Sequence, residues 1–338
     1  ECKPGVSETY VLEQVEKLSF VEKASLNYVV YLDDVPNDPD YNKQWAWQMI
    51  RAEDGWDLVH GSPSVVVAII DSGTDLDHED LADAIWINTG EIPDNGVDDD
   101  ANGYIDDNVG WDFNGDDNNP DHVGADNDHG THVAGIVGAI SNNNIGVAGG
   151  SWNCPVMILK VFPNSGGGAF VDDVSEALRY AADNGASVAN LSLGGTGNPP
   201  IQEEAVLYAY NAGVVVLASA GNGGNDGIGD STPHYPSGNV GAIGVGSTNR
   251  FDEKDGSSNY GESWVDIFSP GVAIRAPLPN DSYGNNSGTS MASPVAAALA
   301  ALIVVQNPGI TPDEVEMRME KACEPINLSN PSFYGELD

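Results

Sequence analysis

The amino-acid sequence predicts an α/β fold in which a mostly parallel sheet carries helices on both faces. Short, unbroken apolar runs, such as residues 65–70 and 156–161, are typical of central parallel strands, because such strands are buried on both faces. These runs alternate along the chain with segments of helical length and periodicity, such as 171–184 and 201–212. Alternating strands and helices indicate crossover connections, and therefore parallel pairing.

The elements are expected in the following order. A short helix lies within 45–59, ahead of the first buried strand, and a buried helix within 295–305 closes the series. Glycines at 185 and 213 mark the ends of two helices, as is usual at helix C-termini. Strands are expected at 65–70, 156–161, 188–193, 214–218, 241–245 and 264–268, and further helices at 129–140, 171–184 and 201–212.

The first residues differ from the rest of the chain. Apolar residues between 11 and 18 fall at helical spacing, and 21–32 read as a strand. A linker rich in Asp and Pro follows at 33–39. We therefore expect two parts, 1–34 and 35–338.

The charge balance restricts the possible partners. The 338 residues include 12 basic and 52 acidic ones, with a formal net charge of −40. This charge argues against nucleic acid or an anionic membrane as a partner, and it indicates cation binding, a salt-rich medium, or both. We find no apolar run long enough to span a bilayer. Cys2, Cys154 and Cys323 lack metal-ligand spacing and allow at most one internal disulfide, whose pairing the sequence leaves open.

An insertion at about 88–128 is dense in Asp, Asn and Gly, and no Lys or Arg occurs between Arg51 and Lys160. Crowded carboxylates repel one another unless a cation neutralises them. The segment 98–106 has oxygen ligands at alternate positions and Gly at the sixth, like the front half of an EF-hand loop, although Val109 stands where the bidentate Glu is usual. We expect Ca²⁺ here rather than a solvated acidic loop. The expected ligands are Asp98, Asp100, Asn102, Tyr104 and Asp106.

Four residues together supply the chemistry of a nucleophilic serine. Ser290 follows a small-residue turn and opens an apolar helix, whose N-terminus offers free N–H groups. Alone, Ser290 would read as an N-cap. Asp71 ends the first buried strand, and His129 and Asn222 also lie at the ends of regular elements. An orienting carboxylate, a base and an oxyanion donor are what such a serine requires.

The stretches 67–73, 129–135 and 288–294 resemble, in family order, the three signature blocks of subtilisin-like serine proteases (subtilases) of the thermitase or bacterial secreted type. The resemblance covers roughly 36–338. It implies a three-layer subtilisin-like fold and a secreted, monomeric endopeptidase that acts on protein or peptide substrates through an acyl-enzyme intermediate.

The resemblance also implies a role for each of the four residues. Ser290 is the nucleophile, His129 the general base and Asp71 its orienting carboxylate. Asn222 corresponds to the oxyanion-hole amide and acts together with the Ser290 N–H. By contrast, Ser293 reads only as a residue of the helix start.

Substrate and metal sites follow from the same resemblance. Two extended segments, Gly166, Gly167 and Gly168 and Ser192, Leu193 and Gly194, match the substrate-binding strands. His234 lies at the base of the primary specificity pocket, unless it swings away, and an imidazole there would favour medium-sized or polar residues before the scissile bond. A second Ca²⁺ site would use Asp38 and Asp80, with the side chain of either Asn142 or Asn143 and carbonyls of the same loop, namely those of Ile140, Ile145 and Val147.

Residues 1–34 resemble the end of an inhibitory, chaperone-like propeptide, or else form an ordinary N-terminal extension. We expect a longer precursor. Two other functions remain compatible with the same residues, a peptide ligase or macrocyclase and an inactive binding module. The intact set Asp71, His129, Asn222 and Ser290 argues against the second, and nothing in the sequence indicates that an amine outcompetes water.

Overall fold

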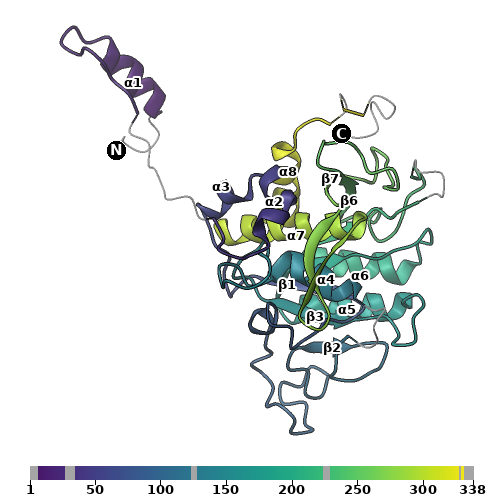
Figure 1. Ribbon diagram of the computed structural model, residues 1–338. Coiled ribbons are helices and arrows are strands. Elements are labelled where there is room, and N and C mark those ends of the chain that lie inside the picture. Colours follow the sequence, from purple (N-terminus) through teal and green to yellow (C-terminus); the bar gives the residue numbers. More distant parts are fainter. Residues whose placement is uncertain (1–6, 27–34, 123–127, 224–228, 327–328, 331–338) are drawn as a thin grey trace. The chain divides into compact units, whose positions relative to one another are not determined.

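The computed structural model describes residues 7–26, 35–122, 128–223, 229–326 and 329–330 (Figure 1). Its contacts divide the chain into two compact units, Glu1–Asp34 and Val35–Asp338. The first unit contains helix α1 (Glu8–Glu16), where the Ser7 side chain accepts a hydrogen bond from the Tyr10 N–H. The second half of the strand predicted at 21–32 lies outside the described residues, and the described half, 21–26, has no strand.

A seven-stranded sheet forms the centre of the second unit, and every neighbouring pair of strands is parallel. Its strand order is β2-β3-β1-β4-β5-β6-β7. The prediction of a mostly parallel α/β sheet is thus confirmed. The strands are β1 (Val66–Asp71), β2 (Gly110–Asp112), β3 (Val156–Lys160), β4 (Ala186–Leu191), β5 (Val215–Ser219), β6 (Ala242–Thr248) and β7 (Ile267–Pro270).

Helices cover both faces of the sheet and create two apolar cores. On one face α4 (His129–Gly138) and α7 (Thr289–Gln306) pack on alternate side chains of β1 such as Val67 and Ile69. On the other, α5 (Val171–Asp183) and α6 (Pro200–Asn211) pack on the intervening side chains such as Ala68 and Ile70. This alternation follows from the two-residue period of a strand. Figure 1 shows the helices on both faces.

Helix α7 corrects one expectation. Within the described residues it is the one helix whose length and hydropathy would suffice to cross a membrane, so an apolar run of sufficient length does exist. However, 67% of it is buried inside the protein, where it contacts β4, β5, β6 and β7. The apolar composition of α7 is therefore explained by its packing in the protein core.

The short helix predicted within 45–59 corresponds to two helices, α2 (Trp45–Met49) and α3 (Ala52–Trp56). Several other elements were not predicted. One is a hairpin of β8 (Ile274–Leu278) and β9 (Ser282–Asn286). Another is helix α8 (Pro312–Ala322), which starts with a capping box between Thr311 and Glu314. The others are the short helices η1 (Tyr41–Lys43) and η2 (Ala82–Ala84). Cys154 and Cys323 are free, and Cys2 lies outside the described residues.

Candidate active site

Asp71 and His129 come together at the carboxyl end of β1. The Asp71 Oδ1 atom lies 2.7 Å from His129 Nδ1 and also accepts the Ser72 N–H at 2.7 Å. The turn after Asp71 touches the start of α4 so closely that a Cβ at Gly130 would lie 2.1 Å from the Gly73 carbonyl oxygen. Only a residue without a side chain permits this contact. The two glycines therefore set the imidazole against the carboxylate.

The environment of His129 adjusts its basicity. Burial lowers the pKa of His129, but the charge and hydrogen bond of Asp71, aided by the charge of Asp128, outweigh it, so the pKa lies above its ordinary value. Asp71 itself is 1% exposed. A buried carboxylate that holds Nδ1–H leaves Nε2 as the basic nitrogen.

Ser290 occupies the first turn of α7, directly after Gly288 and Thr289. The N–H groups in the first turn of a helix have no intrahelical partner. The Ser290 hydroxyl donates to the Ser192 carbonyl at 3.2 Å. In the described part of the chain no hydrogen bond joins Ser290 to His129. Such a bond is often long or absent without substrate, and rotation about one side-chain torsion redirects the hydroxyl.

The Asn222 amide is oriented by the residue that precedes Ser290. Its Oδ1 accepts the Thr289 N–H at 3.0 Å and the Thr289 hydroxyl at 3.3 Å. Within the described residues Nδ2 has no acceptor, and Asn222 is exposed. Gly288 has φ +139°, and a Cβ there would lie 3.1 Å from Nδ2. The amide therefore presents a free donor beside the first turn of α7.

The two predicted substrate-binding segments differ in their surroundings. Gly166, Gly167 and Gly168 are exposed, and a Cβ on any of them would meet open space. The other segment follows β4, and its neighbour Gly195 pairs with Tyr235 through hydrogen bonds of 2.9 and 2.8 Å. Ser192 is buried, Leu193 half-buried and Gly194 exposed.

His234 lies between two glycine-containing walls of the site. A Cβ at Gly194 would lie 2.5 Å from the His234 Cε1 atom, and one at Gly221 would lie 3.0 Å from the same ring. Burial lowers the pKa of His234, although a hydrogen bond with the Ser219 backbone partly opposes this effect. The ring is therefore neutral at neutral pH. This position between the walls is the one expected of a residue that shortens the pocket.

Asp38 and Asp80 meet at the predicted loop. The Asp38 carboxylate accepts the Asn142 and Asn143 N–H groups at 2.8 and 3.1 Å. Asp80 accepts the Asn143 side-chain amide at 2.8 Å and the Val147 N–H at 3.0 Å. The Asn143 side chain thus contacts Asp80, whereas Asn142 Oδ1 accepts the Asn37 N–H at 3.3 Å.

The same pair of carboxylates fits a cation. Asp38 and Asp80 are 4% and 0% exposed, and in the described structure no Lys, Arg or His nitrogen lies within 4 Å of either carboxylate. Burial, with a smaller contribution from the Asp38 charge, raises the pKa of Asp80 to about 7. Hard oxygen ligands of this kind suit Ca²⁺. The Ile140 N–H donates to the Asp80 carbonyl, and the Ile145 N–H to Asn143 Oδ1.

In the acidic insertion, the carboxylates that lie close together are not the set that the EF-hand-like spacing indicates. Ligand atoms of Glu91, Asp100 and Asp107 lie within 4.8 Å of one another. Asp98 and Asp106 are not in this group, and their carboxylates accept backbone N–H groups of the surrounding turns.

Two other predicted ligands of the insertion make further contacts through their side chains. The Tyr104 ring packs edge-on against Trp111 and Tyr180, and the Asn102 amide donates to Asp107 at 2.9 Å. Sequence spacing missed Glu91 and Asp107, which lie outside the nine-residue pattern. Asp75, Asp121 and His122 form a second group of the same compactness.

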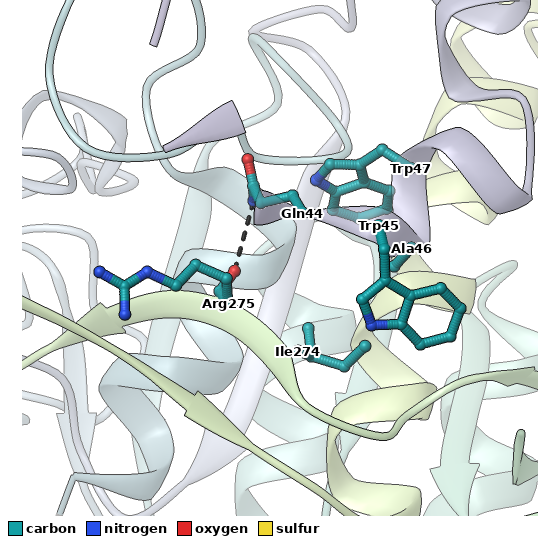
Figure 2. Close-up of a pocket in the computed structure, with 6 residues that line it drawn as sticks. All are labelled: Gln44, Trp45, Ala46, Trp47, Ile274 and Arg275. Atoms are coloured by element: carbon teal, nitrogen blue, oxygen red, sulfur yellow. Dashed lines mark hydrogen bonds between the residues drawn. The ribbon is translucent and has the colours of Figure 1, made fainter. Parts of the chain in front are cut away.

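The best-formed hollows of the described residues lie elsewhere. One, between α2 and β8, is lined by Gln44, Trp45, Ile274 and Arg275 and has no room for a water molecule (Figure 2). Its residues are tied by hydrogen bonds, such as the 3.3 Å bond from Gln44 Nε2 to the Arg275 carbonyl. An open hollow of about 180 Å³ lies between α2 and α3. Neither contains a predicted site residue.

Comparisons with known proteins agree with this geometry. A model of the subtilase family, peptidase S8, matches residues 62–333. Thermitase of Thermoactinomyces vulgaris is 38% identical over 294 residues, which cover 86% of this chain and 92% of thermitase. The halolysin-like extracellular serine protease Nep of Natrialba magadii is 34% identical over 319 residues, which cover 94% of this chain and 54% of Nep.

A solved protease structure from Pseudoalteromonas arctica PAMC 21717 matches with a TM-score of 0.71 and 29% identity, covering 86% of this chain and 93% of its own. The resemblance of the three sequence blocks is thereby confirmed. Fold, family model and relatives agree that this chain belongs to the subtilase family of serine endopeptidases.

Proposed function

We propose that this protein is a secreted, calcium-stabilised serine endopeptidase whose peptide-bond hydrolysis depends on Asp71, His129, Ser290 and Asn222. The single observation that best supports the assignment is the 2.7 Å contact between Asp71 Oδ1 and His129 Nδ1. A buried carboxylate in this position holds the imidazole in the tautomer whose Nε2 can accept a proton.

The proposed reaction proceeds through two transfers. Ser290 Oγ attacks the substrate carbonyl carbon while His129 Nε2 takes the hydroxyl proton. The oxyanion then accepts hydrogen bonds from Asn222 Nδ2 and the Ser290 N–H. His129 gives its proton to the leaving amine, which departs and leaves an acyl ester on Ser290. Water, deprotonated by His129, hydrolyses this ester and regenerates the hydroxyl.

The substrate would bind as an added strand. An extended peptide between Gly166–Gly168 and Ser192–Gly194 would form main-chain hydrogen bonds, which tolerate many sequences. The open space around the three glycines supports this arrangement. His234 would limit the side chain before the scissile bond.

Calcium would stabilise the fold at Asp38, Asp80 and the 142–147 loop. When bound, the ion neutralises the two buried carboxylates. The net charge of −40 and the acidic trio of the insertion support further cation binding. The relative Nep is described as an extracellular protease, which supports the proposal that this protein is secreted. We further propose that 1–34 derives from a propeptide that acts as inhibitor and chaperone and that the protease is monomeric.

The test combines a variant with an active-site label. Ser290→Ala should lower kcat on a peptide ester by more than about 10⁴-fold, since only binding and the oxyanion donors remain. A fluorophosphonate should label wild type stoichiometrically and leave Ser290→Ala unlabelled. Retention of more than about one hundredth of kcat would overturn the assignment, because loss of a serine nucleophile costs far more than this.

The same preparation separates the alternative functions. Unlabelled, inactive but folded wild type would indicate a binding module. Preferential transfer of the acyl group to an added amine would indicate a ligase. Ser151→Ala is a suitable control, because Ser151 is also buried and its hydroxyl donates to the Val137 carbonyl.

A further inference from the structure

We propose that Asn190 is a positioning residue for the nucleophile, anchored by Ser293. This inference rests on the proposed role of Ser290. Asn190 is the penultimate residue of β4, and Ser293 lies in α7 three residues after Ser290. The side-chain amide joins the strand that leads to the substrate-binding segment with the helix that carries the nucleophile.

A directed series of hydrogen bonds makes this connection. The Ser293 hydroxyl donates to Asn190 Oδ1 at 2.7 Å, and Asn190 Nδ2 donates to Ser192 Oγ at 3.0 Å. The Ser192 hydroxyl then donates to the Ser290 carbonyl at 2.8 Å. Each hydroxyl and amide group thus has a defined donor direction. The series ends on the backbone of the nucleophile itself.

The location in the core makes the amide unusual. Asn190 and Ser293 are both 0% exposed, and Asn190 is the polar residue in the fully buried part of β4, where it follows Val188 and Ala189 and precedes Leu191. In the sheet it is level with Ile69 of β1 and Leu217 of β5. An apolar side chain would suit these neighbours, whereas a buried amide costs free energy unless its hydrogen bonds are made. A polar residue inside an apolar strand was the sequence signal that could have identified it.

The connection controls a distance that matters for the reaction. Ser192 belongs to the proposed substrate-binding segment, and its carbonyl accepts the Ser290 hydroxyl at 3.2 Å. The hydrogen-bond series fixes the first turn of α7 relative to this segment. It therefore fixes the attacking oxygen relative to the peptide that the segment holds. A displacement of about 1 Å at such a point costs about 100-fold in rate.

The experiment removes the connection in two independent ways. Asn190→Leu preserves most of the volume and removes both amide hydrogen bonds, and Ser293→Ala removes one hydroxyl. Both should lower kcat on a peptide ester by about 10- to 100-fold, with KM changed less than about twofold, because misplacement affects the attack rather than binding. The rate of fluorophosphonate labelling should fall in parallel. The kcat of the double variant should be no lower than that of the less active single variant, because the two residues act as one unit.

A matched control separates positioning from stability. Ser151→Ala also removes a hydroxyl that is 0% exposed, at a place remote from β4 and the start of α7, and should lower the melting temperature while leaving kcat within about twofold. If Asn190→Leu fails to fold, the kcat of Ser293→Ala alone tests the inference. Folded Asn190→Leu or Ser293→Ala with kcat within about twofold of wild type would overturn the inference. Failure of Ser290 as nucleophile would appear separately, as an active Ser290→Ala variant.

Discussion

At the scale of single residues, the proposal that His234 limits the substrate rests on its position between two glycines. Its ring is in close contact with Gly194 and Gly221, so the two walls leave it little freedom to move. Burial lowers its pKa, so the imidazole is uncharged at neutral pH. At the base of the proposed pocket, a neutral, polar and bulky side chain would favour medium-sized or polar substrate residues.

We predict that wild type prefers Leu, Met or Gln before the scissile bond. In His234→Gly, kcat/KM for Phe relative to Leu should rise by at least about tenfold, because the lost imidazole leaves room for the aromatic ring. The measurement is kcat/KM over a matched peptide series, in which the Leu peptide serves as the internal control. Wild type that already prefers Phe, combined with no gain in the glycine variant, would count against this role.

The predictability of the site also differs residue by residue. Asp71, His129, Asn222 and Ser290 lie in contiguous motifs at the ends of regular elements, so the sequence alone identifies them as candidates. Ser293 lies within the block 288–294, but no spacing in the sequence relates it to Asn190, and only the fold brings the two together. Their contact depends on how α7 packs against β4, which no local pattern encodes.

At the scale of elements, the apolar runs were predictable, and the short polar elements were not. Strands β1, β3 and β5 are predictable as unbroken apolar runs, because both of their faces are buried. Strand β9, with the sequence SYGNN, has no alternation and exists because residues 280 and 281, both at positive φ, turn the chain back onto β8. The insertion likewise follows its own turns, in which the Asp98 and Asp106 carboxylates accept backbone N–H groups.

Helix α8 introduces a pH dependence of stability. Burial, followed by the charges of Asp266, Glu320 and Asp313, raises the pKa of Glu316 to about 7. The folded protein therefore binds a proton that the unfolded chain, with an ordinary pKa near 4.5, releases. The stability contributed by this group is fully present below the unfolded pKa and is lost as the pH rises through about 7.

We predict that Glu316→Gln flattens this dependence. The variant should match wild type near pH 4 and melt at a higher temperature near pH 8, values chosen on either side of the shift in pKa. Thermal melts at constant calcium across this range provide the measurement. Glu314→Gln is a contrasting control, because backbone hydrogen bonds at Thr311 lower the pKa of Glu314. Parallel melting curves of wild type and Glu316→Gln would contradict the prediction.

At the scale of the whole molecule, Asp38, Asp80 and the 142–147 loop connect three segments that are distant in sequence. A cation bound there would stabilise only the folded chain, by about 2.7 kcal/mol at a concentration 100 times its dissociation constant. We predict that excess chelator lowers the melting temperature, because the two buried carboxylates then lose their counter-charge. Measurements in the Ser290→Ala background avoid self-digestion.

A variant of the same site supplies the control. Asp80→Asn should reduce the difference between melting temperatures in calcium and in chelator, while Asp83→Asn, within η2 and not part of the site, should preserve it. An unchanged melting curve in excess chelator would argue against structural calcium. An unchanged difference in Asp80→Asn would place the stabilising ion elsewhere, for example at Glu91, Asp100 and Asp107.

The burial of Lys160 affects how well this protein resists cleavage by other proteases. Lys160 is the one basic residue between Arg51 and Arg179. Its side chain is 1% exposed, with Nζ 2.9 Å from Asp112 and donating to the Asp121 carbonyl at 3.0 Å. Trypsin-like proteases require a Lys or Arg that they can reach. Over more than a third of its length, including the whole acidic insertion, the folded chain therefore offers such proteases no bond to cut, however mobile its loops become.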